Sequence, residues 1–178
     1  MEAGTLFKHV KRVAHMSVCV AEQMGIQGES LQDLTACALL HDNALTQYIQ
    51  EELHSDTTDV SKLEEPLQFG LHCSLGERNI QDLPFQTDVR NVILYHHENA
   101  DGSGPFGKKW TEIPLFARII HLCDLLDLTC CTGTFTSDTW KKVEDFLQAV
   151  NGSVVDEVFC PYRRLLISIY KHPFNRNC

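Results

Sequence analysis

Apolar residues recur at intervals of three and four along most of this 178-residue chain, and that spacing is typical of one buried face of an α-helix. The pattern is clearest in two N-terminal segments, at Leu6, Val10, Val13, Leu31 and Leu34. No stretch alternates strictly between apolar and polar residues, as a half-buried strand would. The sequence therefore predicts an all-α fold, in the form of a single compact helical bundle.

Turn-forming residues divide this pattern into separate helices. Gly25 is placed to end the first helix, since glycine adopts the left-handed backbone that closes a helix. Ser137 and Asp138 can cap the start of a late helix, and Gly152 can stop it. Beyond the two N-terminal helices, the spacing predicts helices over about 43–54, 66–81, 87–97, 113–128, 137–150 and 154–172, the last interrupted near Pro161.

Length and charge limit the classes of protein that this chain can belong to. It is long enough for one domain, predicted over residues 1–178, and 43% of its residues are hydrophobic. It has no run of about 18 apolar residues and no signal-peptide pattern, so we expect a cytoplasmic protein without a membrane segment. A net charge of -9 argues against a nucleic-acid partner, because phosphate contacts need clustered lysine and arginine.

Eight cysteines are scattered along the chain without a CxxC pair. A chain of this size does not need disulfide bonds to hold its core. We therefore expect reduced thiols, most of them buried.

Five segments carry imidazole or carboxylate side chains, which are common ligands of transition metals. They are His9, the pair His41 and Asp42, His72, the pair His96 and His97, and Asp124. A lone histidine is more often a core or surface residue than a ligand, so no single histidine carries the prediction.

Asp124 is harder to explain without a ligand role. It lies within IIHLCDLLDL, and a carboxylate buried in so apolar a helix is costly unless it is paired or bound to a metal. Asp127 lies one turn further on and is either a hydrogen-bond partner of a metal ligand or a structural residue. His121, one turn before Asp124, is expected to be a packing histidine.

The stretch HHENADGSGPFG, residues 96–107, places two histidines directly before a glycine-rich turn. Neighbouring helical residues project about 100° apart, so His96 and His97 at a helix end could serve different metal ions. The glycines would let the chain leave the helix steeply. A helix end with a tight turn and no ligand explains the glycines but not the two histidines.

In order and spacing, these segments resemble the HD-GYP branch of the HD-domain phosphohydrolases. HVKRVA at 9–14 is similar to the family's His-x-x-Arg-Val, and ACALLHDNA, ending at Ala44, is similar to its Ala-x-Leu-Leu-His-Asp signature. HCSLGE at 72–77, HHENADGSGP at 96–105 and IPLFARIIHLCDLLD at 113–127 resemble its three later motifs. Five elements in this order are a far stronger signal than one His-Asp pair.

The resemblance implies a metal-dependent phosphodiesterase acting on a cyclic dinucleotide such as cyclic di-GMP, or on another nucleotide. It implies two divalent transition metal ions (Fe, Mn, Ni or Zn), held by His9, His41, Asp42, His72, His96, His97 and Asp124. His41 and Asp42 would be the catalytic pair, with Asp42 bridging the ions and activating water. The substrate would contact Asp101, Gly102 and Gly104. The motifs span about 9–130, and helices over about 137–172 follow.

Four positions depart from the family pattern. Leu45 stands where the family has a lysine, and the tyrosine of Gly-Tyr-Pro is missing after Gly104. The stretch after Asp127 is uncharged until Asp138, where the family offers basic residues for phosphate. An acidic ligand for a third ion would fall at Thr5, which favours two ions.

Two classes of function therefore stay open. The intact set of ligand residues favours the hydrolase. The missing lysine, tyrosine and basic residues favour a degenerate, non-catalytic module that binds a nucleotide or a signalling partner protein.

Overall fold

The computed structural model describes residues 3–45, 47, 66–130, 137–150, 152–155, 158 and 159. This part of the chain holds five helices: α1 (Ala3–Gln23), α2 (Gly28–Leu40), α4 (Pro66–Asn79), α5 (Leu115–Cys130) and α6 (Ser137–Ala149). Within the same residues no strand forms, and Asp101 and Lys109 make an isolated β-bridge. The predicted all-α fold is confirmed.

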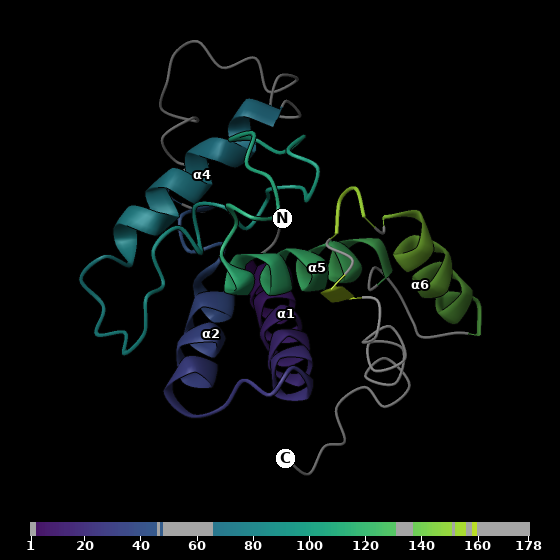
Figure 1. The fold of residues 1–178 in the computed structure, drawn as a ribbon, viewed down its shortest axis with the longest axis horizontal. Helices are drawn as coiled ribbons and strands as arrows, with labels where there is room; N and C mark the ends of the chain where they lie inside the picture. The colour runs from purple at the N-terminus through teal and green to yellow at the C-terminus, as the bar shows by residue number, and fades with distance from the viewer. Residues whose placement is uncertain are drawn as a thin grey trace.

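Helix α5 lies at the centre of the arrangement (Figure 1). It crosses α1, which packs against both α2 and α5. Helix α6 lies beyond the C-terminal end of α5, and α4 lies towards its other end, away from α6. This arrangement leaves the C-terminal end of α2 close to both α1 and the region of α4.

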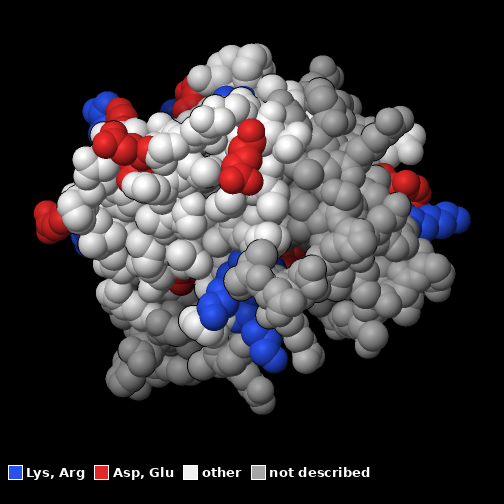
Figure 2. Space-filling view, turned by 90° about the horizontal axis from the view of Figure 1, so that it is seen from below, with Lys and Arg blue, Asp and Glu red and all other residues white. Residues whose placement is uncertain are grey.

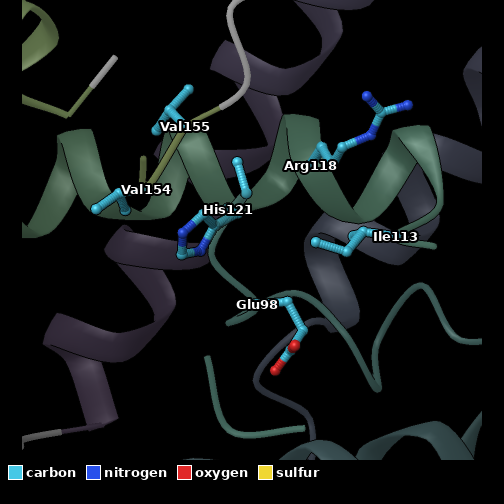
Figure 3. Close-up of a pocket in the computed structure, with 7 residues that line it drawn as sticks. Glu98, Ile113, Arg118, His121, Val154 and Val155 are labelled. Atoms are coloured by element: carbon cyan, nitrogen blue, oxygen red, sulfur yellow. The ribbon is translucent and has the colours of Figure 1, made fainter. Parts of the chain in front are cut away.

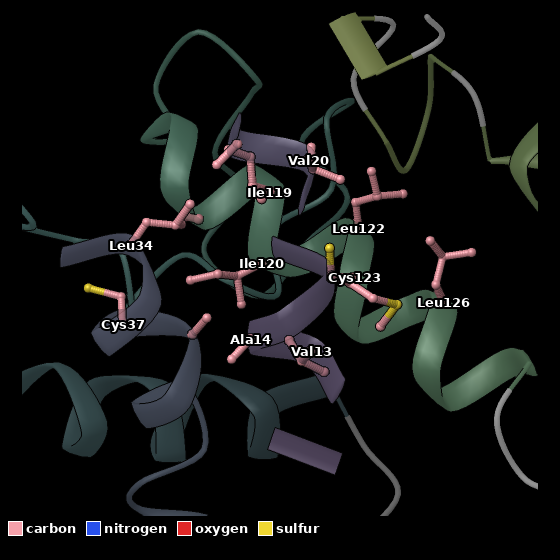
Figure 4. Close-up of a cluster of buried hydrophobic side chains, with 14 of the residues drawn as sticks. Val13, Ala14, Val20, Leu34, Cys37, Ile119, Ile120, Leu122, Cys123 and Leu126 are labelled. Atoms are coloured by element: carbon pink, nitrogen blue, oxygen red, sulfur yellow. The ribbon is translucent and has the colours of Figure 1, made fainter. Parts of the chain in front are cut away.

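The core is built mainly by α1, α2 and α5 (Figure 4). Val13 and Val20 of α1, Leu34 of α2, and Ile119 and Leu126 of α5 are fully buried. Burying one such side chain stabilises the fold by about 1.5–3 kcal/mol. Helix α5 has buried residues on nearly every side, which explains why its sequence is so apolar and why a carboxylate on it needs partners.

Helix α1 ends as the sequence predicts, at a glycine in the left-handed conformation. Gly25 has a φ of 80° and donates its N–H to the carbonyl of Glu22 at 3.0 Å. Ile26 donates to the carbonyl of Ala21 at 2.9 Å. These two bonds form a Schellman motif, which satisfies carbonyl groups that the helix end would otherwise leave unpaired.

The predicted helix over 87–97 is wrong. Residues 90–97 form successive turns instead, and Asn91 adopts a left-handed φ of 64° that breaks a helix. The Glu77 carboxylate of α4 accepts the N–H groups of Asn91, Ile93 and Leu94 at 2.6, 3.0 and 3.0 Å. A side chain from another helix therefore takes the donors that helical hydrogen bonds would have used.

Other predicted helices have different outcomes. The one over 66–81 is confirmed as α4, the one over 113–128 as α5 and the one over 137–150 as α6. Most of 43–54 and the C-terminal helix near Pro161 lie outside the described residues. The single domain over 1–178 therefore stays a prediction.

Four described cysteines, Cys19, Cys37, Cys73 and Cys123, carry free thiols, and the last three are buried. Among the helices of the described ranges, none is both long and apolar enough to cross a bilayer.

Candidate metal centre

The seven predicted ligand residues come together from five places in the fold. His9 lies on α1, His41 and Asp42 directly follow α2, His72 lies on α4, His96 and His97 lie in the turns after α4, and Asp124 lies on α5. The side chains of His41 and His96 are 0% exposed, and those of the other five are at most 15% exposed. The fold thus gathers a buried cluster of polar groups. Its binding of metal stays a prediction.

Asp42 lies at the middle of this cluster. Its Oδ2 atom lies 3.4 Å from His41 Nε2 and 3.8 Å from His9 Nε2. Its Oδ1 atom lies 3.6 Å from His72 Nε2 and 3.9 Å from His96 Nε2. Two ligands about 2.0–2.2 Å from one tetrahedral ion lie roughly 3.3–3.6 Å apart, so both sets are close to ligand spacing.

The cluster divides into two groups on either side of Asp42. We call His9, His41 and Asp124 the core-side group, and His72, His96 and His97 the loop-side group. In the first, His9 Nε2 lies 3.1 Å from Asp124 Oδ1. In the second, the ring centres of His72 and His97 lie 5.0 Å apart. The loop-side side chains lie close enough together to hold one ion, and so do those of His9, His41 and Asp42.

Three of the imidazole rings are oriented by a hydrogen bond at Nδ1. His9 Nδ1 bonds to Asp127 Oδ2 at 2.7 Å. His41 donates to the Ala38 carbonyl at 2.8 Å, and His96 donates to the Ile93 carbonyl at 2.6 Å. For His41 and His96, a proton on Nδ1 leaves the Nε2 lone pair free to face the cluster, which is how metal-binding histidines are commonly held.

Three buried atoms of the cluster make no hydrogen bond within the described part of the chain. They are His41 Nε2, His96 Nε2 and Asp124 Oδ2. Each unpaired buried polar atom costs about 1–3 kcal/mol. Divalent cations would satisfy all three, and imidazole with carboxylate suits Fe, Mn, Ni and Zn. The residues present therefore fit the metal centre that the sequence predicts.

The two groups differ in charge. Burial lowers the pKa of His9, but hydrogen bonds to Asp124 and Asp127 outweigh this effect and raise the pKa to about 9. Burial and the nearby His41 lower the pKa of His96 to about 3. His96 is therefore neutral near pH 7, which is the form that binds metal.

Asp127 bonds to His9, one of the predicted ligand residues, and also makes a structural contact. Besides its bond to His9, it accepts two bonds from the Arg12 guanidinium, at 2.6 and 2.7 Å. Such a bidentate pair holds the carboxylate in one orientation. Asp127 thus fixes His9 through a rigid contact between α1 and α5.

His121 packs beneath the loop-side group and bonds to its backbone. Its Nδ1 atom lies 2.9 Å from the His96 carbonyl oxygen. Figure 3 shows His121 and Arg118 projecting from α5 around a cavity that Glu98 also lines. The cavity measures about 10 Å³, room for roughly one water molecule. These contacts fit the packing role predicted for His121.

The glycine-rich turn after the histidines is held by Glu98, which is 2% exposed. Its carboxylate accepts the N–H of Phe106 at 2.6 Å and the N–H of Lys108. A Cβ atom at Gly104 would lie 2.7 Å from the Glu98 Cα atom, so this approach requires glycine. The turn is therefore anchored to the residue that directly follows the histidine pair.

Asp101, Gly102 and Gly104 all lie in this turn. Asp101 is exposed and accepts the N–H of Ser103 at 2.9 Å. Gly102 has a φ of 87°, which favours glycine for the turn itself. The predicted role of these residues in substrate binding stays a prediction.

His96 and His97 do not project 100° apart from a helix end, because the chain forms turns there. Their ring centres lie 4.0 Å apart, and both belong to the loop-side group. His97 Nδ1 also lies 3.7 Å from Asp124 Oδ2 of the other group. The helix end expected for this pair is therefore wrong, and both imidazoles lie on the loop side of Asp42.

Three residues at the cluster were absent from the predicted site. Glu77 and Glu98 hold backbone N–H groups of the loop side, and Cys73 places its thiol beside His72 and His96. Glu98 directly follows the two histidines, and this position is a signal that the sequence contains. Glu77 ends the HCSLGE segment, but no spacing predicts its role, since its partners are backbone atoms 14 or more residues away.

The chain is similar in sequence to known proteins. The family model described as the HD domain matches residues 1–151. A cyclic di-GMP phosphodiesterase of Pseudomonas aeruginosa is 30% identical over 165 residues, covering 86% of this chain and 37% of the relative. A 3′3′-cGAMP-specific phosphodiesterase of Vibrio cholerae is 30% identical over 122 residues, covering 67% of this chain and 27% of the relative.

A similar fold occurs in a solved structure of an HDG"Y"P protein from Bdellovibrio bacteriovorus. The two superpose with a TM-score of 0.64 at 22% identity, over 93% of this chain and 52% of the other. The chain spans less than half the length of the two curated relatives described above.

Proposed function

Because the chain belongs to the HD-domain family, we propose that it is a metal-dependent phosphohydrolase that cleaves a phosphodiester bond of a cyclic dinucleotide. The two curated relatives are named for cyclic di-GMP and 3′3′-cGAMP, which supports this substrate class without choosing between them. The observation that carries the proposal is the position of Asp42, whose two carboxylate oxygens face different groups of histidines. A carboxylate in that position can be shared by two ions.

We assign one ion to the core-side group and one to the loop-side group, with Asp42 as the shared ligand. Two divalent cations bound there would offset the charge of a phosphodiester and lower the pKa of a water molecule towards neutrality. Iron, manganese, nickel and zinc all suit the donor set. The assignment of His9, His41, Asp42, His72, His96, His97 and Asp124 as ligands is part of this proposal.

The chain's own contribution is orientation and exclusion of water. The carbonyls of Ala38 and Ile93 and the carboxylate of Asp127 hold three imidazoles with Nε2 towards the cluster. Burial of His41 and His96 keeps bulk water from these atoms, which strengthens electrostatic interactions at the site. These residues would act through the ligands that they position.

The substrate side of the site lacks the cation that the family pattern offers, since Leu45 replaces the lysine. On the face in Figure 2, lysine and arginine side chains form one cluster near the lower edge and also appear singly at the left, top and right margins, and acidic side chains likewise lie in several places. With a net charge of -9, the whole molecule does not attract an anion. The proposed ions would therefore supply most of the attraction, and Asp101, Gly102 and Gly104 would shape the entrance.

The test is hydrolysis by protein loaded separately with Mn²⁺, Fe²⁺, Ni²⁺ or Zn²⁺. Substrates are cyclic di-GMP, 3′3′-cGAMP and an activated aryl phosphodiester, and metal-free protein is the control. We expect cleavage that depends on the identity of the metal and that Asp42→Ala abolishes. Metal-loaded protein that cleaves none of the three would contradict the proposal.

A non-catalytic module is the second candidate, and Leu45 is the observation that favours it. If metal-loaded protein binds a cyclic dinucleotide in calorimetry but releases no product, this second candidate replaces the first. A cytoplasmic location and a signalling partner protein stay predictions under either function.

A further inference from the structure

A buried thiol lies against the loop-side group. Cys73 is 0% exposed, and its Sγ atom lies 3.6 Å from His72 Nε2 and 3.7 Å from His96 Nδ1. Cys73, His72, His96 and His97 place one ligand atom each within 4.8 Å of the others. The thiol therefore belongs spatially to the same group as the three imidazoles.

The distances within this group are those expected for ligands of one shared ion. A nitrogen about 2.0–2.1 Å and a sulfur about 2.3 Å from one tetrahedral ion lie roughly 3.6 Å apart. The separation of His72 Nε2 from Cys73 Sγ is 3.6 Å, and that of His72 Nε2 from Asp42 Oδ1 is also 3.6 Å. His72 Nε2 thus lies at ligand spacing from a sulfur and from an oxygen at once.

A second observation concerns the other nitrogen of the His96 ring, whose Nδ1 atom is the one that lies 3.7 Å from the thiol. His96 Nε2 is fully buried and makes no hydrogen bond among the described residues. Its Nδ1 atom already bonds to the Ile93 carbonyl at 2.6 Å, so Nε2 is the atom left to bind an ion. This nitrogen lies 3.9 Å from Asp42 Oδ1.

We propose that Cys73 is a thiolate ligand of the ion in the loop-side group. The sulfur–metal bond forms as the thiol proton leaves to solvent, with no change of oxidation state. A soft sulfur donor favours Zn²⁺, Fe²⁺ or Co²⁺ over Mn²⁺ at this position, whereas the core-side group has only imidazole and carboxylate. The inference rests on the proposed metal centre and goes beyond it by giving the two ions different ligand chemistry.

Cobalt substitution tests this inference through an optical signal rather than through activity. Protein loaded with Co²⁺ alone should show visible ligand-field bands from any bound cobalt. Only a cobalt–thiolate bond adds an intense sulfur-to-cobalt charge-transfer band in the near ultraviolet. We expect that band in the unaltered protein and its loss in Cys73→Ser and Cys73→Ala, with the visible bands retained.

Cys37→Ala is the matched control, because Cys37 is another fully buried thiol in the core cluster. The control should keep the charge-transfer band. A band that persists in Cys73→Ser, or that disappears in Cys37→Ala, would place the sulfur elsewhere and overturn the inference. Visible bands without a charge-transfer band in the unaltered protein would overturn it while leaving the metal centre intact. Absence of all cobalt bands would contradict the metal centre itself.

X-ray absorption at the zinc edge gives an answer even if the Cys73 variants do not fold. Unaltered protein loaded with Zn²⁺ should show a sulfur neighbour at about 2.3 Å beside nitrogen and oxygen neighbours at about 2.0–2.2 Å. A first shell made only of nitrogen and oxygen would overturn the inference.

Discussion

The core-side and loop-side groups lie on opposite sides of the same aspartate, but the chain holds them in different ways. His9 and Asp124 stand on regular helices that pack into the core, and His41 directly follows α2. In the loop-side group, only His72 stands on a helix. His96 and His97 lie in a run of turns that Glu77 and Glu98 hold on either side through backbone N–H groups.

The two groups also differ in the chemistry that they present. The core side has two carboxylates around one histidine, with Asp124 and Asp127 bonded to His9. The loop side has three imidazoles and the Cys73 thiol. One position is thus rich in carboxylate oxygens and rigid through packing, and the other has softer donors and depends on a few polar contacts. Two positions that face the same carboxylate therefore need not be equivalent.

The largest effect is expected at Asp42, which faces both groups and is their proposed shared ligand. Asp42→Ala removes the one anion between the groups, so two bound cations would face each other unscreened. We expect loss of both ions and of all hydrolysis, measured by elemental analysis and by product release. Retention of two ions per chain would show that Asp42 does not bridge them.

A smaller effect, confined to the core side, is expected from Asp127→Ala. His9 would lose the bond that orients its ring, and removing such a partner lowers metal affinity by about 10–100-fold. Chelator competition should show one ion leaving more readily while the other is unchanged. The loop-side ion is the internal control, and equal weakening of both ions would argue against separate groups.

On the loop side, Glu77→Gln is expected to destabilise the turns that carry His96 and His97. The glutamine keeps one carbonyl oxygen for the three N–H groups that the carboxylate accepts, at a cost of about 1–3 kcal/mol in the free energy of unfolding. Urea unfolding of metal-free protein measures this cost. Metal titration should then show weaker binding at one position.

Asp33→Asn is the matched control for that variant. Asp33 also accepts backbone N–H groups, from Gln86 and Thr87, in the same connection between α4 and the histidine pair. It should cost similar stability and leave metal binding unchanged. If both variants weaken metal binding equally, the loss comes from general destabilisation rather than from the turns at the histidines.

The smallest effect is expected from Leu45→Lys, which alters neither group of ligands. A cation at this partly buried position would favour the phosphate and raise kcat/KM by no more than about tenfold, since one partly exposed charge contributes roughly 1 kcal/mol. Steady-state kinetics on cyclic di-GMP measures it, with Leu45→Met as the uncharged control. A gain with methionine as well would rule out an electrostatic cause.

The core-side and loop-side groups differ in how far the sequence predicts their structure. The core-side positions follow from helical spacing, because Val13 and Val20 mark the buried face of α1, and because a carboxylate inside the apolar α5 must have partners. The backbone conformation of the loop side does not follow from the spacing of its apolar residues. Val89, Val92 and Ile93 also have helical spacing, but Glu77 takes the N–H groups that a helix needs. No local sequence pattern indicates that a side chain from another segment will accept these hydrogen bonds.

Cys73 shows a second limit. In sequence it is a small residue next to a histidine, and a cysteine at such a position is most often a core residue. Its closeness to His96, 23 residues later, appears only once α4 and the turns are placed together. Spacing therefore identified the histidines and aspartates, but only the three-dimensional arrangement placed the thiol beside them.

The contacts of Glu98 with the glycine-rich turn limit how this turn can change in length. Gly104 packs against the Glu98 backbone and Phe106 is bonded to its carboxylate, so Pro105 alone lies between two fixed points. A residue added or lost there must be accommodated outward, away from the histidine pair. Natural variation in the length of this turn could therefore alter what the proposed site accepts, while the predicted ion ligands keep their places.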